Sequence, residues 1–98
     1  MTREKDVQRD VVNLFRGAGC IVYNLSQPRA TMQTPGLSDL LVFCLRKRAF
    51  WFFEVKTPEG KQSEDQENFE KRCETADVTY ACGGVDAAED QLKAIGVL

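Results

Sequence analysis

Apolar residues recur along this chain with two different periods, and the change of period separates helices from strands. From Arg3 to Gly17 they repeat every three to four residues, as on one face of a helix, and Gly17 to Gly19 ends the run. From Leu37 to Leu45 and from Ala49 to Lys56 the chain is almost continuously apolar, which is typical of buried strands. The basic turn Arg46-Lys47-Arg48 between these two segments predicts an antiparallel hairpin.

The remaining elements are shorter and are marked by capping and turn residues. Ser63 with Gln66 forms a capping-box pattern that predicts a second helix, and Asp86 with Glu89 repeats the pattern before a third. Further strands are expected at 20–24 and 78–82. The predicted order is αβββαβα, an α/β fold in which residues 1–98 form a single domain.

Composition narrows the chemistry that such a domain can perform. The chain has no histidine, and its four cysteines form no Cys-x-x-Cys pair, so neither a structural zinc site nor a histidine-dependent nucleophile is expected. No apolar run approaches the roughly 20 residues that a membrane helix needs, and the N-terminus lacks a signal-peptide core. These features predict a cytoplasmic protein with no membrane contact, whose chemistry depends on carboxylates, lysine and a metal.

The net charge of −2 hides an uneven distribution. Residues 1–61 carry ten Lys and Arg against six Asp and Glu, whereas residues 62–98 carry three against nine. The basic part contains Asp39, Glu54 and Lys56, and a basic surface around an acidic metal centre suits a polyanionic substrate. Two solvated faces of opposite charge are an equally good explanation of the distribution alone.

Three charged residues lie in the two apolar strands, where burial is costly unless a charge is paired or binds a metal. Asp39 is near the start of the first strand, and Glu54 and Lys56 project from one face near the end of the second. An antiparallel hairpin would bring all three together. Because Mg²⁺ prefers oxygen ligands, we expect Asp39, Glu54 and the backbone carbonyl of Val55 to bind it. Lys56 would then stabilise the charge that develops on a phosphodiester.

Glu4 and Gln66 are weaker candidates for the same site. Glu4 continues the apolar stripe of the first helix and is expected to face the sheet, within reach of the metal's water shell. Gln66 lies at a helix N-terminus, which attracts anions. Local roles are the alternative: a solvated helix start for Glu4, a capping partner for Gln66, and an exposed ion pair for Glu54 and Lys56.

With these residues in view, the chain resembles the VRR-NUC (virus-type replication-repair nuclease) domain, a branch of the PD-(D/E)xK nuclease superfamily. The resemblance spans nearly the whole chain. It is carried by Glu4 with Gln8, Pro35 to Asp39, Glu54-Val55-Lys56, Gly60 to Gln66, Phe69, and the strand and short helix from Val78 onward. Ser38 stands where the family usually has proline, directly before the metal-binding aspartate.

The resemblance implies a restriction-endonuclease-like core, in which a mixed four-stranded sheet is flanked by helices, and Mg²⁺- or Mn²⁺-dependent cleavage of DNA. It also implies that Asp39 and Glu54 bind the metal, that Lys56 is catalytic, and that Glu4 and Gln66 support them. Small members resemble archaeal-type Holliday junction resolvases, which implies a homodimer acting on branched DNA or four-way junctions in a phage or bacterial context.

Other functions remain open at this point. Within the nucleases, the chain is compatible with a monomeric flap or nicking nuclease, an exonuclease or a restriction-like enzyme. Outside them, a catalytically silent nucleic-acid-binding module with the same fold is the main alternative, although the complete set of Asp39, Glu54 and Lys56 favours an enzyme. An anti-restriction protein is suggested only by the acidic C-terminal part and is supported by no motif.

DNA contacts are expected from the basic part of the chain, mainly to phosphates. Arg29 and Lys61 are favoured because their loops flank the site, and Gln33 accompanies Arg29. Secondary candidates are Gln8, Arg46, Lys47 and Arg48, the last three at the far end of the hairpin. Any outward-facing part of the aromatic run Phe50 to Phe53 would form a dimer patch, although core packing explains most of such a run.

Overall fold

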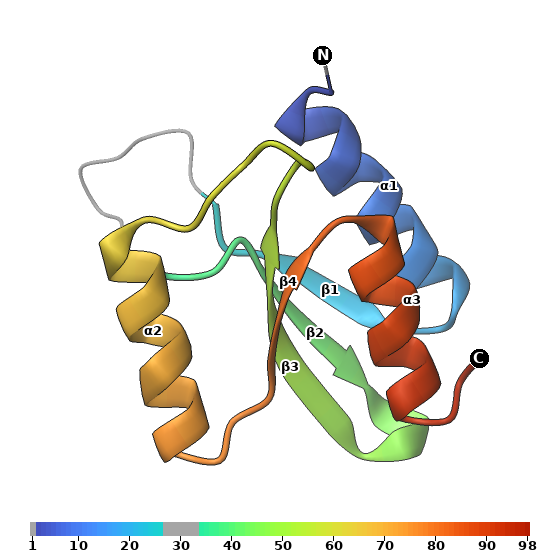
Figure 1. Ribbon diagram of the computed structural model, residues 1–98. Helices are drawn as coiled ribbons and strands as arrows, with labels where there is room; N and C mark the ends of the chain where they lie inside the picture. The colour runs from blue at the N-terminus through green and yellow to red at the C-terminus, as the bar shows by residue number, and fades with distance from the viewer. Residues whose placement is uncertain (1, 27–33) are drawn as a thin grey trace.

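The chain folds into a four-stranded sheet with two helices on one face and a third helix on the other (Figure 1). The computed structural model describes residues 2–26 and 34–98. The elements are α1 (Glu4–Gly17), β1 (Ile21–Asn24), β2 (Leu40–Cys44), the 3₁₀ turn η2 (Leu45–Lys47), β3 (Ala49–Val55), α2 (Glu64–Thr75), β4 (Tyr80–Gly83) and α3 (Val85–Ala94). None of the described helices has the length and apolarity that a membrane crossing requires.

The sheet is mixed, as expected from the resemblance. Its strands lie in the order β1-β2-β3-β4, with antiparallel pairing from β1 to β3 and parallel pairing between β3 and β4. In the hairpin register Leu40 lies opposite Phe53, so the preceding Asp39 falls opposite Glu54. On the other side of β3, Glu54 is paired with Cys82. The register therefore places the two carboxylates side by side at one end of the sheet.

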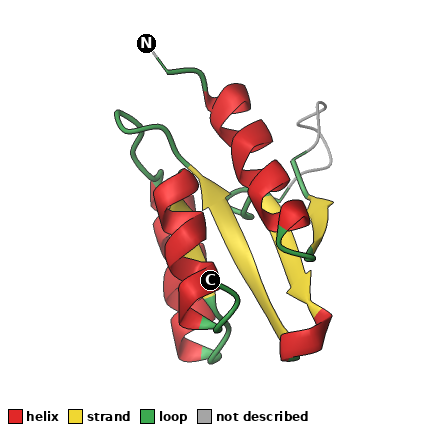
Figure 2. Cartoon of the chain, turned by 90° about the vertical axis from the view of Figure 1, so that its right-hand side faces the viewer, coloured by secondary structure: helices red, strands yellow, loops and turns green. Residues whose placement is uncertain are grey.

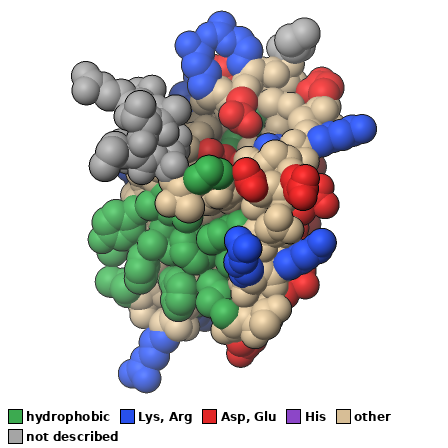
Figure 3. All heavy atoms as spheres, turned by 90° about the vertical axis from the view of Figure 1, so that its left-hand side faces the viewer, with side chains coloured by type: hydrophobic (Ala, Val, Ile, Leu, Met, Phe, Trp, Pro, Cys, Tyr) green, Lys and Arg blue, Asp and Glu red, His purple; other side chains and the backbone are tan. Residues whose placement is uncertain are grey.

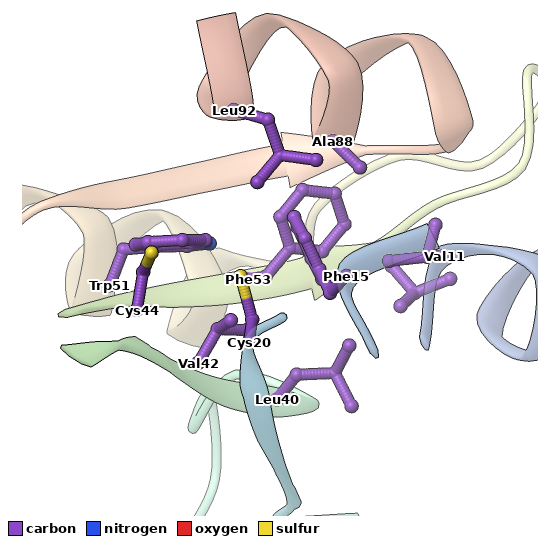
Figure 4. Close-up of a cluster of buried hydrophobic side chains, with 11 residues drawn as sticks. Val11, Phe15, Cys20, Leu40, Val42, Cys44, Trp51, Phe53, Ala88 and Leu92 are labelled. Carbon is purple, nitrogen blue, oxygen red and sulfur yellow. The ribbon is translucent and has the colours of Figure 1, made fainter. Parts of the chain in front are cut away.

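Helices α1 and α3 pack together on one face of the sheet, the side turned toward the viewer in Figure 2. The core lies between them and the strands (Figure 4). Phe15 of α1 packs edge-to-face on Trp51 and Phe53 of β3, with ring centroids 5.5 and 5.3 Å apart. Such aromatic pairs contribute about 0.5–1.5 kcal/mol beyond the area that they bury. Strand β3 is thus anchored from the helix side by alternate residues.

The intervening residues of β3 point to the opposite face. Phe52 is covered by Phe69 of α2, with ring centroids 5.2 Å apart. Phe50 lies beyond the helix and is 47% exposed. The aromatic run is therefore mostly core, as its composition suggested, with one ring facing outward.

Helix α2 begins as predicted, whereas α3 does not. Ser63 and Gln66 form the complete capping box. For α3, the predicted cap at Asp86 is wrong: the helix starts at Val85, and its N-cap is Gly84, which makes no side-chain cap bond. The chain passes directly from β4 into the helix through Gly83 and Gly84, and a Cβ on Gly84 would lie only 3.3 Å from Val7. Asp86 instead occupies the first helical turn, where a negative charge is favourable.

All four cysteines are free thiols. Cys44 is a fully buried core residue, as expected from its strand. Cys82 is only partly buried, because it projects toward the less covered face of the sheet. The cysteines thus take part in packing and not in cross-linking.

Candidate active site

Asp39 is held in one orientation by hydrogen bonds from two segments of the chain. Its Oδ2 accepts a hydrogen bond of 2.9 Å from the backbone N–H of Val55, across the hairpin. Its Oδ1 accepts one of 2.7 Å from the hydroxyl of Ser26, in the segment after β1. The N–H of Leu25 donates to the backbone carbonyl of Asp39 at 2.7 Å. The carboxylate is therefore fixed before any ligand arrives.

Glu54 is the buried acid of the site, with 2% of its surface exposed. Its Oε2 accepts a 2.8 Å hydrogen bond from the Gln66 amide and lies 3.6 Å from the Lys56 ammonium. Its Oε1 is also buried but has no hydrogen-bond partner among the described residues. A buried acceptor in this condition costs about 1–3 kcal/mol, and more when charged.

The pKa of Glu54 is raised by its burial and by the neighbouring carboxylates. Burial is the largest cause that raises its pKa to about 8, and the neighbouring Asp39 carboxylate raises it further. The Lys56 ammonium acts in the opposite direction, and Glu4 adds a small upward contribution. Two carboxylates that are opposite each other in a sheet and compensated by a single lysine form a site that favours an additional cation.

The donor set fits a hard divalent cation. No three Asp, Glu or Cys side chains gather into a metal cluster in the part of the chain that is described. Mg²⁺, however, is usually bound through one or two carboxylates and keeps several waters, so Asp39 and Glu54 suffice as anchors. The observation in favour of this fit is the Oε1 of Glu54, for which the described part of the chain supplies no hydrogen-bond partner. The backbone carbonyl of Val55 stays a predicted third ligand, next to an N–H that already binds Asp39.

Lys56 and Gln66 lie directly against the carboxylates. Lys56 follows β3, and its backbone N–H donates to the Gly83 carbonyl, which anchors it beside β4. Its side chain is 16% exposed, so the ammonium is near the surface but not free in solvent. Gln66 is the capping partner of Ser63, since its Oε1 accepts from the N–H of Ser63, and its Nε2 also donates to Glu54. A catalytic role for Gln66 stays a prediction.

Glu4 is placed differently from its prediction. It is exposed at the first residue of α1 and does not pack on the sheet, because this end of the helix extends past the strands (Figure 1). Its charge nevertheless contributes to the raised pKa of Glu54, so the two carboxylates interact electrostatically. A role of Glu4 through water at a metal remains a prediction.

The predicted DNA-contacting residues are spread over the molecule. Arg29 and Gln33 lie outside the described residues. Lys61 is exposed in the loop between β3 and α2, at the site's end of the sheet. The turn with Arg46, Lys47 and Arg48 lies at the opposite end of the hairpin, as expected, and Arg46 donates to the Ala18 carbonyl at 2.6 Å. Gln8 is partly buried on α1.

Two further residues shape the site: Ser26, which carries no signal in the sequence, and Gly36, which belongs to the segment from Pro35 to Asp39 but for which the sequence indicates no role of its own. Ser26 bonds to Asp39, but it belongs to a polar connector whose path cannot be deduced from periodicity. Gly36 has a φ of 85° and packs directly against the backbone of Asp65 in α2. Only glycine tolerates both that dihedral and that close contact. The loop before Asp39 is thereby joined to the start of α2, where Gln66 lies.

Comparisons with known proteins agree with this geometry. No protein-family model matches the sequence, and no curated protein is similar to it at a significant level. A solved structure described as "VRR_NUC domain" superposes with a TM-score of 0.75 and 27% sequence identity, covering 96% of this chain and 97% of that one. The agreement in fold over nearly the full length of both chains supports a stand-alone VRR-NUC domain, a nuclease domain of the PD-(D/E)xK type.

Proposed function

We propose that this protein is a Mg²⁺- or Mn²⁺-dependent endonuclease that hydrolyses DNA phosphodiester bonds. The observation that carries the proposal is the buried Oε1 of Glu54, which has no hydrogen-bond partner within residues 2–26 and 34–98, beside the fixed carboxylate of Asp39. Leaving that oxygen without a partner would destabilise the fold for no structural gain. The two carboxylates would hold a divalent cation, which would remove that cost and supply the Lewis-acid chemistry of the site.

When bound, such a cation would polarise a phosphodiester oxygen and make a water more acidic. The chain's own groups have separate tasks. Lys56 presents a positive charge 3.6 Å from Glu54, where it would stabilise the extra negative charge of the transition state and orient the attacking water. Gln66 holds Glu54, while Ser26 and the N–H of Val55 hold Asp39. A site oriented in advance loses little free energy to reorganisation during the reaction.

The proposal extends to a homodimer that cuts four-way junctions. Its support is an apolar patch, here called the open sheet face, on the side of β1, β2 and β3 opposite α1 and α3: Ile21, Tyr23, Phe43 and Phe50 (Figure 3). Three of them are 43%, 53% and 47% exposed: Ile21, Tyr23 and Phe50. Phe43 links Tyr23 to Phe50, with ring centroids 5.7 and 5.8 Å away.

A second copy is the occupant that this face suits. In a two-fold dimer the same patch on both copies is buried at once, which an exposed apolar sheet surface favours. Asp39 and Glu54 lie on the same side of the strands as the patch, so two sites would be held at a fixed separation. A four-way junction has two symmetric strands to cut, and two such sites match that symmetry.

The test is a cleavage panel combined with a measured solution mass. Labelled four-way junctions, flaps, duplexes and single strands are incubated with Mg²⁺ or Mn²⁺, and Asp39→Asn serves as the inactive control. We expect paired cuts in the junction and the mass of a dimer. A monomer that nicks flaps would favour the monomeric alternative, and binding without any cleavage would favour a silent module.

A further inference from the structure

A second feature, away from the carboxylates, is a groove between α1 and the edge strand β1. It encloses about 380 Å³, and its floor includes Val12 and Val22. Its polar lining consists of Lys5, Gln8, Arg9, Asn13, Arg16 and Asn24. Every one of these groups is a cation or an amide, and no carboxylate lines the groove among the described residues. We call it the α1–β1 groove.

The cations of the groove form a row along the helix. Lys5 and Arg16 are 11 residues apart, which at 1.5 Å per residue spans roughly 16 Å. Neither takes part in an ion pair with another described residue. Arg9, between them, donates to Asp10 at 3.2 Å and lies 3.5 Å from Asp6, so its charge is partly compensated. The positive charge available to a ligand therefore lies mainly at the two ends of the row.

One end of the groove is connected to the active site by hydrogen bonds. Asn24 lines it and accepts a hydrogen bond of 2.9 Å from the N–H of Ser26, whose hydroxyl donates to Asp39. Strand β1 pairs only with β2 among the described strands, so its outer edge lies open beside the helix. A polymer that enters the groove at Arg16 and follows it to Asn24 would leave it at the end of the sheet where Ser26 bonds to Asp39, with the carboxylates around the edge of β1 on the opposite face.

We propose that the α1–β1 groove binds the phosphate backbone of a DNA arm that runs away from the cleaved bond, an inference that rests on the function proposed above. The occupant follows from charge complementarity: separated cations with amide donors between them suit a chain of regularly spaced anions. The contacts are to phosphates, so they add affinity and direct the arm without reading sequence.

The experiment compares the double variant K5Q/R16Q with the matched control K71Q/R72Q, which removes two exposed charges toward the C-terminal end of α2, away from both the groove and the site. Both carry Asp39→Asn, so that binding is measured without cleavage. Fluorescence anisotropy with a labelled duplex and a labelled junction gives Kd over a series of salt concentrations. Circular dichroism verifies that each variant is folded.

We expect K5Q/R16Q to weaken binding at least fivefold and to reduce the slope of log K against log salt by about 1.8, which corresponds to two phosphate contacts at about 0.9 each. The control should change neither quantity. An unchanged slope in a folded K5Q/R16Q, an equal loss in the control, or no DNA binding at all in the parent would overturn the proposal. So would polyglutamate of equal charge competing as well as DNA, because the groove would then bind anions in general.

This design separates the two proposals. If the wild-type protein cuts DNA and the slope of K5Q/R16Q is unchanged, the endonuclease stands and the groove assignment falls. If the wild-type protein cuts no DNA but the slope falls as expected, the groove binds DNA and the endonuclease proposal fails.

Discussion

The two faces of the sheet receive different kinds of side chain from the same strand, β3. On the face under α1 and α3, β3 contributes Trp51, Phe53 and Val55, all fully buried in an apolar core. On the other face it contributes Phe50, partly exposed, and Glu54, a carboxyl group whose pKa is raised to about 8, chiefly by burial. Because side chains alternate along a strand, a rigid core on one side positions reactive groups on the other. The core face stabilises the fold. The opposite face contains a buried carboxyl group and an exposed aromatic ring, both unfavourable in free energy unless a cation binds or a second copy packs there.

The largest expected effect is the loss of DNA cleavage when a predicted metal ligand, Asp39, is replaced. Asp39→Asn should lower DNA cleavage on the order of 10³-fold or more, because it weakens cation binding and removes a fixed negative charge. Folding should be preserved, since an amide oxygen still accepts from the N–H of Val55. Asp90→Asn, on the exposed side of α3, is the matched control. Full activity of Asp39→Asn in Mg²⁺ would refute the assignment.

The next prediction compares the loss of stability when β3 loses an aromatic ring on the core face and when it loses one on the opposite face. Phe53→Ala should cost about 3–5 kcal/mol in the free energy of unfolding, because it removes a fully buried ring that packs on Phe15. Phe50→Ala should cost less than about 1 kcal/mol in the monomer, since the ring is half exposed, but should weaken a dimer formed through the open sheet face. Urea denaturation and a solution mass measure both effects. Similar losses of stability in the two variants would remove the distinction between the faces.

Lys56 should affect the rate of the reaction and not the affinity for DNA. Lys56→Ala is expected to reduce kcat roughly 10²-fold, the scale for loss of one preorganised electrostatic group. Lys61→Ala, in the exposed loop that follows, is expected to alter affinity instead. Single-turnover kinetics with separate binding titrations distinguish the two. A Lys56→Ala protein with normal turnover and weaker binding would make Lys56 a phosphate anchor.

The smallest effect concerns pH and the metal-free protein. The folded-state pKa of Glu54 is raised from 4.5 to about 8, so its neutral form is favoured in the fold. Its contribution to stability is therefore fully present below about pH 4.5 and is lost as the pH rises through about 8. In EDTA, the Tm of the wild-type protein should fall between pH 5 and pH 8 relative to Glu54→Gln. Added Mg²⁺ should raise the wild-type Tm more at pH 8 than at pH 5. Parallel pH profiles for the two proteins would contradict this assignment.

The sequence alone determined the type and order of the elements and the convergence of Asp39, Glu54 and Lys56. These depend on local information: the period of the apolar residues, alternation along each strand, and a short turn that sets the hairpin register. The start of α3 was predicted wrongly because a capping-box pattern at Asp86 does not reveal that Gly84 must pack against Val7.

Only the tertiary structure decided which distant residues complete the site. The bond from Ser26 to Asp39 depends on the path of a connector, and the bond from Gln66 to Glu54 depends on how α2 docks on the sheet. The α1–β1 groove likewise arises from the distance between a helix and an edge strand, which no periodicity encodes. Secondary structure follows from interactions between near neighbours in the sequence. The partners of a buried charge follow from how separate elements fill the space around the core.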